Sequence, residues 1–256
     1  SSAASDVYKR QVVEELEAQG VRKTGDSSSL GPGDTVVIRS HGELKSVVED
    51  LESRGVRCVN AACPHVIRIQ RLVAQAEAEG RQPIIIGEAN HPEVAGIASW
   101  CTHPLVFDGP EAVQIWLDDP ARDREIPVTV VAQTTCIRKL FESSWKIIKK
   151  ECTNAEFFDT ICGATSKRQE EAVQLAAQCG AMVVIGDRQS SNTRKLAELC
   201  RENEQLRTYL REREFPELRG RETSRGTAGC IRKIRKLFSG EDTEEPELSL
   251  IHISEP

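Results

Sequence analysis

Short apolar runs rich in β-branched residues alternate with segments of helical periodicity along most of the chain. Runs of about four to eight such residues, bounded by polar or turn-forming residues, are typical of strands. The expected strands are residues 35–39, 57–60, 83–86, 127–132 and 181–185. Because helical patterns separate these runs, the sequence predicts an α/β fold with small, mostly parallel sheets.

Two of the intervening segments, 44–54 and 66–79, carry apolar residues at three- and four-residue spacing, which is typical of helices that bury one face. Pro64 stands where the first turn of a helix tolerates a proline. Gly55, Gly80 and Gly180 each stand where a helix is expected to end before the next strand. These signals agree on where the expected helices begin and end.

The two ends of the chain and its last fifth are patterned less clearly. Residues 1–10 and 248–256 fit no periodic pattern, and we expect these ends to be non-native. The stretch 203–225 is dense in Arg and Glu without an apolar stripe, so the expected fold is weakly defined after about residue 203. We expect α/β domains at 11–62, 63–160 and 161–240, with an N-terminal strand and helix missing from the first.

Composition and charge exclude several classes of protein. A net charge of -6 argues against general nucleic-acid binding, which needs a basic surface to meet phosphates. No apolar run approaches the roughly 20 residues that span a bilayer, and no secretory signal opens the chain, so we expect a cytoplasmic protein. Its nine cysteines contain no CxxC pair and are not expected to form disulfides in a reducing compartment.

Polar clusters follow four of the expected strands, where α/β folds usually bind ligands. The imidazoles of His41 and His91 stand at equivalent strand ends and could share one anionic ligand. Taken alone, the clusters at Ser190 and Gln133 are better explained as helix caps, and a His-Glu pair on a loop as a hydrogen-bonded surface feature. These alternatives stay open. The clusters are Ser40-His41-Gly42, Asn90-His91-Pro92-Glu93, Gln133-Thr134-Thr135 and Ser190-Ser191-Asn192.

Two cysteines, Cys63 and Cys162, stand at expected strand-to-helix junctions, unlike Cys179, which stands at a helix end. Taken singly, each could be a buried, inert thiol. Together with the polar strand ends, however, they indicate a cavity for an anionic ligand beside a metal centre.

These motifs occur in the order found in one family of enzymes. From about residue 11 to residue 200 the chain resembles the 4-hydroxy-3-methylbut-2-enyl diphosphate reductases of the non-mevalonate isoprenoid pathway. The resemblance implies a cloverleaf of three α/β domains around a central cavity, with the first domain incomplete here. The motifs that carry it are Ser40-His41-Gly42, Ala62-Cys63-Pro64, His91-Pro92-Glu93-Val94, Gln133-Thr134-Thr135, Ile161-Cys162-Gly163-Ala164-Thr165 and Ser190-Ser191-Asn192.

The resemblance also implies a role for each matched residue. A 4Fe-4S cluster held by three cysteines would leave one iron for the substrate hydroxyl. Cys63 and Cys162 would be cluster ligands; the third ligand belongs to a segment absent from this chain, which would therefore be truncated at the N-terminus. The implied substrate-binding residues are His41, His91, Gln133, Thr134, Ser190, Ser191 and Asn192, and the implied catalytic residues are Glu93, Thr134 and His91.

The implied reaction is the reductive dehydroxylation of 4-hydroxy-3-methylbut-2-enyl diphosphate to isopentenyl and dimethylallyl diphosphate, with electrons from ferredoxin or flavodoxin. Two departures stand out: Ala62 replaces a threonine of the family, and Thr227-Ala228-Gly229 runs into Cys230 where the family continues Ala-Ser. Two alternatives stay open. One is a phosphate-binding α/β module without redox chemistry, and the other is an inactive fragment of the reductase.

Overall fold

The computed structural model describes residues 14–22, 24–178, 181–185, 190–201 and 248–252. The chain divides into two compact units between Lys167 and Arg168, and each unit is described by itself. No helix within these described ranges is long and apolar enough to cross a membrane.

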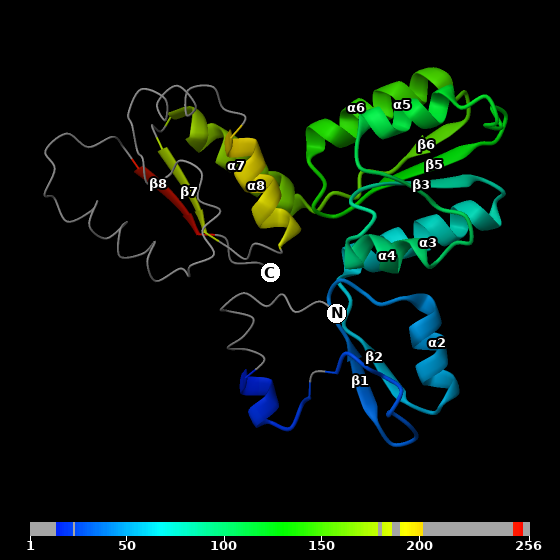
Figure 1. Ribbon diagram of the computed structural model, residues 1–256, viewed down its shortest axis with the longest axis vertical. Helices are drawn as coiled ribbons and strands as arrows, with labels where there is room; N and C mark the ends of the chain where they lie inside the picture. The colour runs from blue at the N-terminus through cyan, green and yellow to red at the C-terminus, as the bar shows by residue number, and fades with distance from the viewer. Residues whose placement is uncertain (1–13, 23, 179–180, 186–189, 202–247, 253–256) are drawn as a thin grey trace, which may run out of the picture. The chain divides into compact units, whose positions relative to one another are not determined.

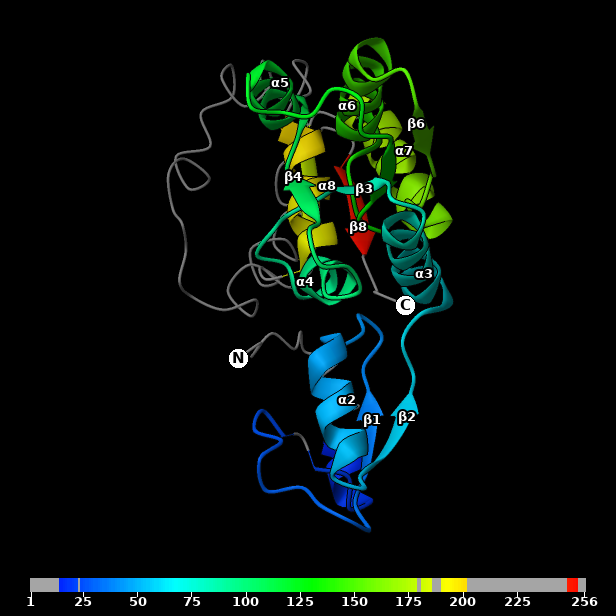
Figure 2. The same ribbon diagram turned by 90° about the vertical axis from the view of Figure 1, so that its right-hand side faces the viewer.

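The first unit opens with a two-stranded parallel sheet. β1 (Thr35–Ile38) pairs with β2 (Arg57–Asn60) in the register Thr35 to Arg57, and α2 (Lys45–Ser53) connects them. In Figures 1 and 2 this helix lies along one face of the pair. Gly55 adopts a φ of 77° after α2, as expected for a glycine that ends a helix. Both predicted strands and the predicted helix are confirmed here.

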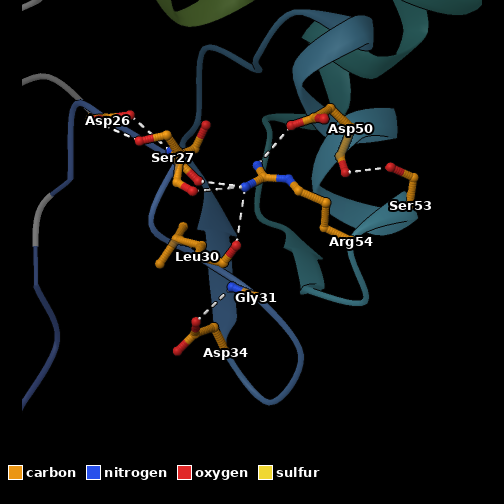
Figure 3. A network of polar contacts seen from close by, with 9 residues as sticks. Asp26, Ser27, Leu30, Gly31, Asp34, Asp50, Ser53 and Arg54 are labelled. Carbon is orange, nitrogen blue, oxygen red and sulfur yellow. Dashed lines mark hydrogen bonds and ion pairs between the residues drawn. The ribbon is translucent and has the colours of Figure 1, made fainter.

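Arg54, at the end of α2, ties this helix to the segment before β1 (Figure 3). Its Nη1 donates hydrogen bonds to the carbonyl oxygens of Ser27 at 2.9 Å and Leu30 at 3.0 Å. Its Nη2 forms an ion pair with Asp50 at 2.7 Å. The carbonyl oxygens of the irregular segment 27–30 are therefore bonded by the Arg54 side chain and not by a neighbouring strand.

The larger sheet of the first unit has four parallel strands in the order β4-β3-β5-β6. Neighbouring residues of β3 and β5 point to opposite faces, as the two-residue period of a strand requires. Ile84 and Val130 join a core cluster with α5 and α6, whereas Ile85 and Val131 join one with α3 and α4. Figure 1 shows these helix pairs on the two faces. The elements are β3 (Gln82–Ile86), β4 (Leu105–Phe107), β5 (Val128–Ala132), β6 (Ala155–Phe157), α3 (Pro64–Ala78), α4 (Pro92–Ala98), α5 (Pro110–Asp118) and α6 (Arg138–Glu151).

The edge strands β4 and β6 were not predicted from the sequence. Each is three residues long, and none of their residues is fully buried. A strand that short shows no periodicity in its sequence. It forms because the central strand beside it provides backbone hydrogen-bond partners. The central strands β3 and β5, by contrast, were correctly predicted.

The second unit contains most of α7 (Gly163–Gln178), then β7 (Ala181–Ile185), α8 (Ser191–Arg201) and β8 (Leu248–His252). β7 and β8 are parallel, in the register Ala181 to Leu248. Ala172, Ala176, Leu196 and Cys200 form its core cluster. Residues 248–252 form a strand beside β7, and that this end of the chain is non-native stays a prediction. Gly180, the third predicted helix stop, lies outside the described residues.

The predicted α/β class is confirmed, with three small parallel sheets in the described ranges. The division into domains at 11–62, 63–160 and 161–240 stays a prediction, as does a central cavity between them.

Candidate active site

Two imidazoles from different sheets meet at the carboxyl ends of their strands. The rings of His41, after β1, and His91, after β3, lie 5.9 Å apart between centroids and make an edge-to-face contact at 74°. The loop that carries His41 is held against α4, because the Lys45 backbone N–H donates to Ser99 Oγ at 2.9 Å. The first unit therefore brings these two predicted site residues together.

The His91 ring also caps the helix that follows it. The Glu93 backbone N–H donates to His91 Nδ1 at 3.1 Å, and His91 is the N-cap residue of α4. Because Nδ1 accepts this hydrogen bond, a neutral ring carries its proton on Nε2. The local backbone thus fixes the tautomer and makes Nε2–H a donor suited to an anionic oxygen.

Glu93 is almost completely buried, with 1% of its surface exposed, and is held by Thr134 after β5. The Thr134 backbone N–H donates to Glu93 Oε1, and the Thr134 hydroxyl donates to Oε2, both at 2.7 Å. A buried carboxyl group needs such partners, since an unsatisfied one is costly. The two contacts fix the plane of the carboxyl group and join it to a hydroxyl that can pass a proton.

Gln133, the neighbour of Thr134, is fully buried and lies across the end of β3. Its backbone N–H donates to the Ile86 carbonyl oxygen at 2.9 Å, and its side-chain oxygen accepts from the Glu88 backbone N–H at 3.1 Å. A Cβ at Gly87 would lie 2.7 Å from the Gln133 Cβ, closer than side chains pack. Because Gly87 has no side chain, Gln133 can occupy this position.

Cys63 and Cys162 both stand at the predicted junctions and are half-buried. The Cys63 backbone N–H donates to the Ser40 carbonyl oxygen, and the Cys162 backbone N–H donates to the Thr134 carbonyl oxygen, both at 2.9 Å. Each cysteine is thus bonded through its backbone to one of the polar strand ends. Whether their thiolates bind a cluster stays a prediction.

Four other cysteines are poor candidates for metal ligands because burial favours their neutral thiols. Burial raises the pKa of Cys101 to about 11, with the Glu77 carboxyl group adding to the effect. Burial also raises the pKa of Cys58, Cys152 and Cys200. Across the described ranges no group of three or more His, Cys, Asp or Glu side chains is arranged to hold a metal ion.

In the second unit, Ser190, Ser191 and Asn192 stand at the start of α8. Ser190 Oγ accepts a hydrogen bond from the Thr193 backbone N–H at 3.3 Å, so Ser190 has the capping role that the sequence left open. Asn192 is buried, and its Oδ1 makes no hydrogen bond to the described residues. This oxygen is an acceptor, so a water or a ligand that donates a hydrogen bond would satisfy it. Anion binding at the start of α8 stays a prediction.

The sequence analysis missed three residues that hold this site: Gly87, Thr160 and Arg138. Thr160 and Asp159 directly precede the Ile161-Cys162 motif, and that proximity is the one signal that could have found them. Arg138 Nη1 forms an ion pair with Asp159 at 3.0 Å, and its Nη2 donates to Ser166 Oγ at 3.1 Å. Nothing in the sequence indicated that Arg138 would link these two residues.

The chain has the fold of a reductase family. The family described as LytB protein matches residues 5–218, which extends beyond residues 11–200 on both sides. The chain is 36% identical to the 4-hydroxy-3-methylbut-2-enyl diphosphate reductase of Caldanaerobacter subterraneus subsp. tengcongensis over 93% of this chain and 86% of that protein. It is 40% identical to the same reductase of Geobacter sulfurreducens over 79% of this chain and 70% of that one.

Solved structures agree with this similarity. One is an (E)-4-hydroxy-3-methyl-but-2-enyl diphosphate reductase described as the terminal enzyme of the non-mevalonate pathway; it matches at a TM-score of 0.56 and 33% identity, over 77% of this chain and 69% of that one. The reductase from Plasmodium falciparum matches at a TM-score of 0.67 and 23% identity, over 74% and 59% of the two chains, and supports the fold alone. The chain belongs to the LytB family of 4-hydroxy-3-methylbut-2-enyl diphosphate reductases.

Proposed function

We propose that this protein catalyses the reductive dehydroxylation of 4-hydroxy-3-methylbut-2-enyl diphosphate to isopentenyl and dimethylallyl diphosphate. In this reaction the allylic C–O bond breaks, two electrons and two protons are consumed, and water is released. The buried pair of Glu93 and Thr134, next to the His91 ring that contacts His41, is the observation that carries the proposal. The alternative, a phosphate-binding module without redox chemistry, predicts binding without dye oxidation.

The imidazoles of His41 and His91 are proposed to hold the diphosphate. Their edge-to-face contact lets two donors converge on one anion, and Nε2–H of His91 is already set as a donor by the cap at Nδ1. Ser190, Ser191 and Asn192 are proposed to bind diphosphate through hydroxyl, amide and backbone N–H donors at the start of α8, a proposal that rests on the resemblance to the reductase family.

Proton delivery is assigned to Glu93 through Thr134. The Thr134 hydroxyl donates to Glu93 Oε2 at 2.7 Å, and a proton can pass along this hydrogen bond between the carboxyl group and a substrate atom that contacts the hydroxyl. Gln133 is proposed to lie beside the substrate, because its position next to Thr134 is enforced by Gly87. Burial keeps bulk water away from the pair and strengthens these contacts.

The family's 4Fe-4S cluster would supply the electrons and a Lewis-acidic iron for the leaving oxygen. Cys63 and Cys162 are proposed as two of its thiolate ligands, because both are joined by backbone hydrogen bonds to the polar strand ends. The proton path through Glu93 and Thr134 does not depend on the cluster and rests on its own contacts.

The proposed electron donor is ferredoxin or flavodoxin, and the proposed compartment is the cytoplasm. Both proposals rest on the resemblance to the reductase family.

The test is an anaerobic assay of the reconstituted protein with reduced methyl viologen. We expect dye oxidation that depends on the substrate, together with iron and sulfide bound to the chain. Cys63→Ser and Cys162→Ser should each lose iron, whereas Cys152→Ser, a buried thiol whose pKa burial raises, should keep it. Substrate binding without dye oxidation would instead support the inactive fragment. A protein that neither binds the substrate nor oxidises the dye would refute the proposal.

A further inference from the structure

The segment that leads into Cys162 runs along the end of β5 after the regular ladder has stopped. β5 and β6 pair as far as Val130 and Phe157. Beyond them, the Phe158 backbone N–H donates to the Val130 carbonyl oxygen, and the Cys162 backbone N–H donates to that of Thr134, both at 2.9 Å. Ala132 lies between these two contacts. Its backbone N–H and carbonyl oxygen, which face the segment after β6, are hydrogen-bonded to a side chain.

That side chain is Thr160. Its hydroxyl accepts a hydrogen bond from the Ala132 backbone N–H at 2.8 Å and donates one to the Ala132 carbonyl oxygen at 2.6 Å. One hydroxyl can do both, because it has a single proton and two lone pairs. Thr160 is 3% exposed, so water has little access to replace it. The hydroxyl thus takes the place of a strand neighbour and satisfies two backbone groups that are costly to leave unpaired.

The other contacts around Cys162 are closer to solvent. Asp159 Oδ1 accepts from the Ile161 backbone N–H at 3.2 Å, and Asp159 is paired with Arg138, but its side chain is 53% exposed. Exposed ion pairs contribute little, because water and salt screen them. Thr160 is therefore the buried attachment that sets where this segment lies against β5.

We propose that Thr160 is a positioning residue, which fixes the backbone of Cys162 against Thr134 and through it the orientation of the Glu93 carboxyl group. The links are continuous: Thr160 holds Ala132, Cys162 holds the carbonyl oxygen of Thr134, and Thr134 holds Glu93 with its N–H and its hydroxyl. The catalytic consequence rests on the function proposed above, whereas the positional one does not. A displacement of about 1 Å in such a site can cost about 100-fold in rate.

The test compares Thr160→Val, which keeps the shape and removes the hydroxyl, with Thr160→Ser, which keeps the hydroxyl. Thr129→Val is the matched control, because Thr129 is also a buried threonine, and its hydroxyl accepts from Arg81 Nε at 2.7 Å near the opposite end of β5. Native-state amide exchange is measured at Cys162 and Thr134, and kcat and KM are measured in the dye assay.

We expect Thr160→Val to speed exchange at the Cys162 and Thr134 amides by about tenfold or more, since these amides would open locally. It should lower kcat by about tenfold and change KM by less than about threefold. Thr160→Ser should restore both quantities to near wild type. Thr129→Val should leave both amides protected, whatever its effect on the melting temperature.

Equal acceleration in Thr160→Val and Thr129→Val would reduce Thr160 to a general contributor to stability and overturn the proposal, as would unchanged exchange in Thr160→Val. If the valine variant does not fold, Thr160→Ala is measured instead, and the same comparison with Thr129→Val decides. Absence of reductase activity in the wild type would count against the proposed function only, since the exchange experiment needs no turnover.

Discussion

Replacing Glu93 with glutamine should remove the proton donor and leave the shape of the site intact. The glutamine oxygen can accept from the Thr134 backbone N–H in place of Oε1. Its amide nitrogen can donate to the Thr134 hydroxyl in place of Oε2, because a hydroxyl can turn from donor to acceptor. Both contacts survive, so the free energy of unfolding should change by less than about 2 kcal/mol, the difference between charged and neutral hydrogen bonds.

The effect on catalysis should be much larger. Loss of a positioned acid–base group costs about 100-fold or more in turnover, which corresponds to about 2.7 kcal/mol in the barrier. KM should change by less than about threefold, because the imidazoles of His41 and His91 remain. Both parameters are obtained from dye oxidation at several substrate concentrations.

The chain offers a closely matched control in Glu77 on α3. Its carboxyl group accepts from the backbone N–H and the hydroxyl of Thr102, the same pair of donors that Thr134 gives to Glu93. Glu77 is partly exposed and does not stand at a strand end. Glu77→Gln should therefore leave kcat unchanged. Equal kcat values in Glu93→Gln, Glu77→Gln and the wild type would remove Glu93 from the proton path.

Further variants test how the fold supports the site. Gly87→Ala should lower the free energy of unfolding by about 1–3 kcal/mol, because its Cβ would meet that of Gln133 at 2.7 Å; an unchanged melting temperature would contradict this. Arg54→Ala should expose residues 27–30 to limited proteolysis, since three carbonyl contacts in this segment are lost; a cleavage pattern like that of the wild type would argue against it. Cys101, with its pKa raised to about 11, should be alkylated about 100-fold more slowly at pH 8 than a thiol of pKa 9, and its rate should rise as the pH approaches 11; rapid labelling at pH 8 would refute this.

The central strands could be predicted from sequence, because residues such as Ile84, Ile85 and Val130 are buried on both faces of the sheet and form unbroken apolar runs. The edge strands β4 and β6 could not, since three residues, none of them fully buried, carry no pattern. Their existence depends on neighbours far along the chain.

The positions of the site residues at strand ends were equally predictable, because parallel strands bring their carboxyl ends to one edge. The hydrogen bonds that join these residues could not be predicted. The two bonds between Glu93 and Thr134 connect residues 41 positions apart, and the bonds of Thr160 to Ala132 span 28. Such pairings depend on register and rotamer, which periodicity does not encode.

Reaction in deuterated water followed by mass spectrometry of the products tests the central claim most directly. With reduced methyl viologen, the reconstituted protein should convert 4-hydroxy-3-methylbut-2-enyl diphosphate to isopentenyl and dimethylallyl diphosphate. Each product molecule should carry one deuterium bound to carbon, delivered through Glu93 and Thr134, and Glu93→Gln should form little of either. Recovery of unchanged substrate, or of products without solvent deuterium, would contradict the account.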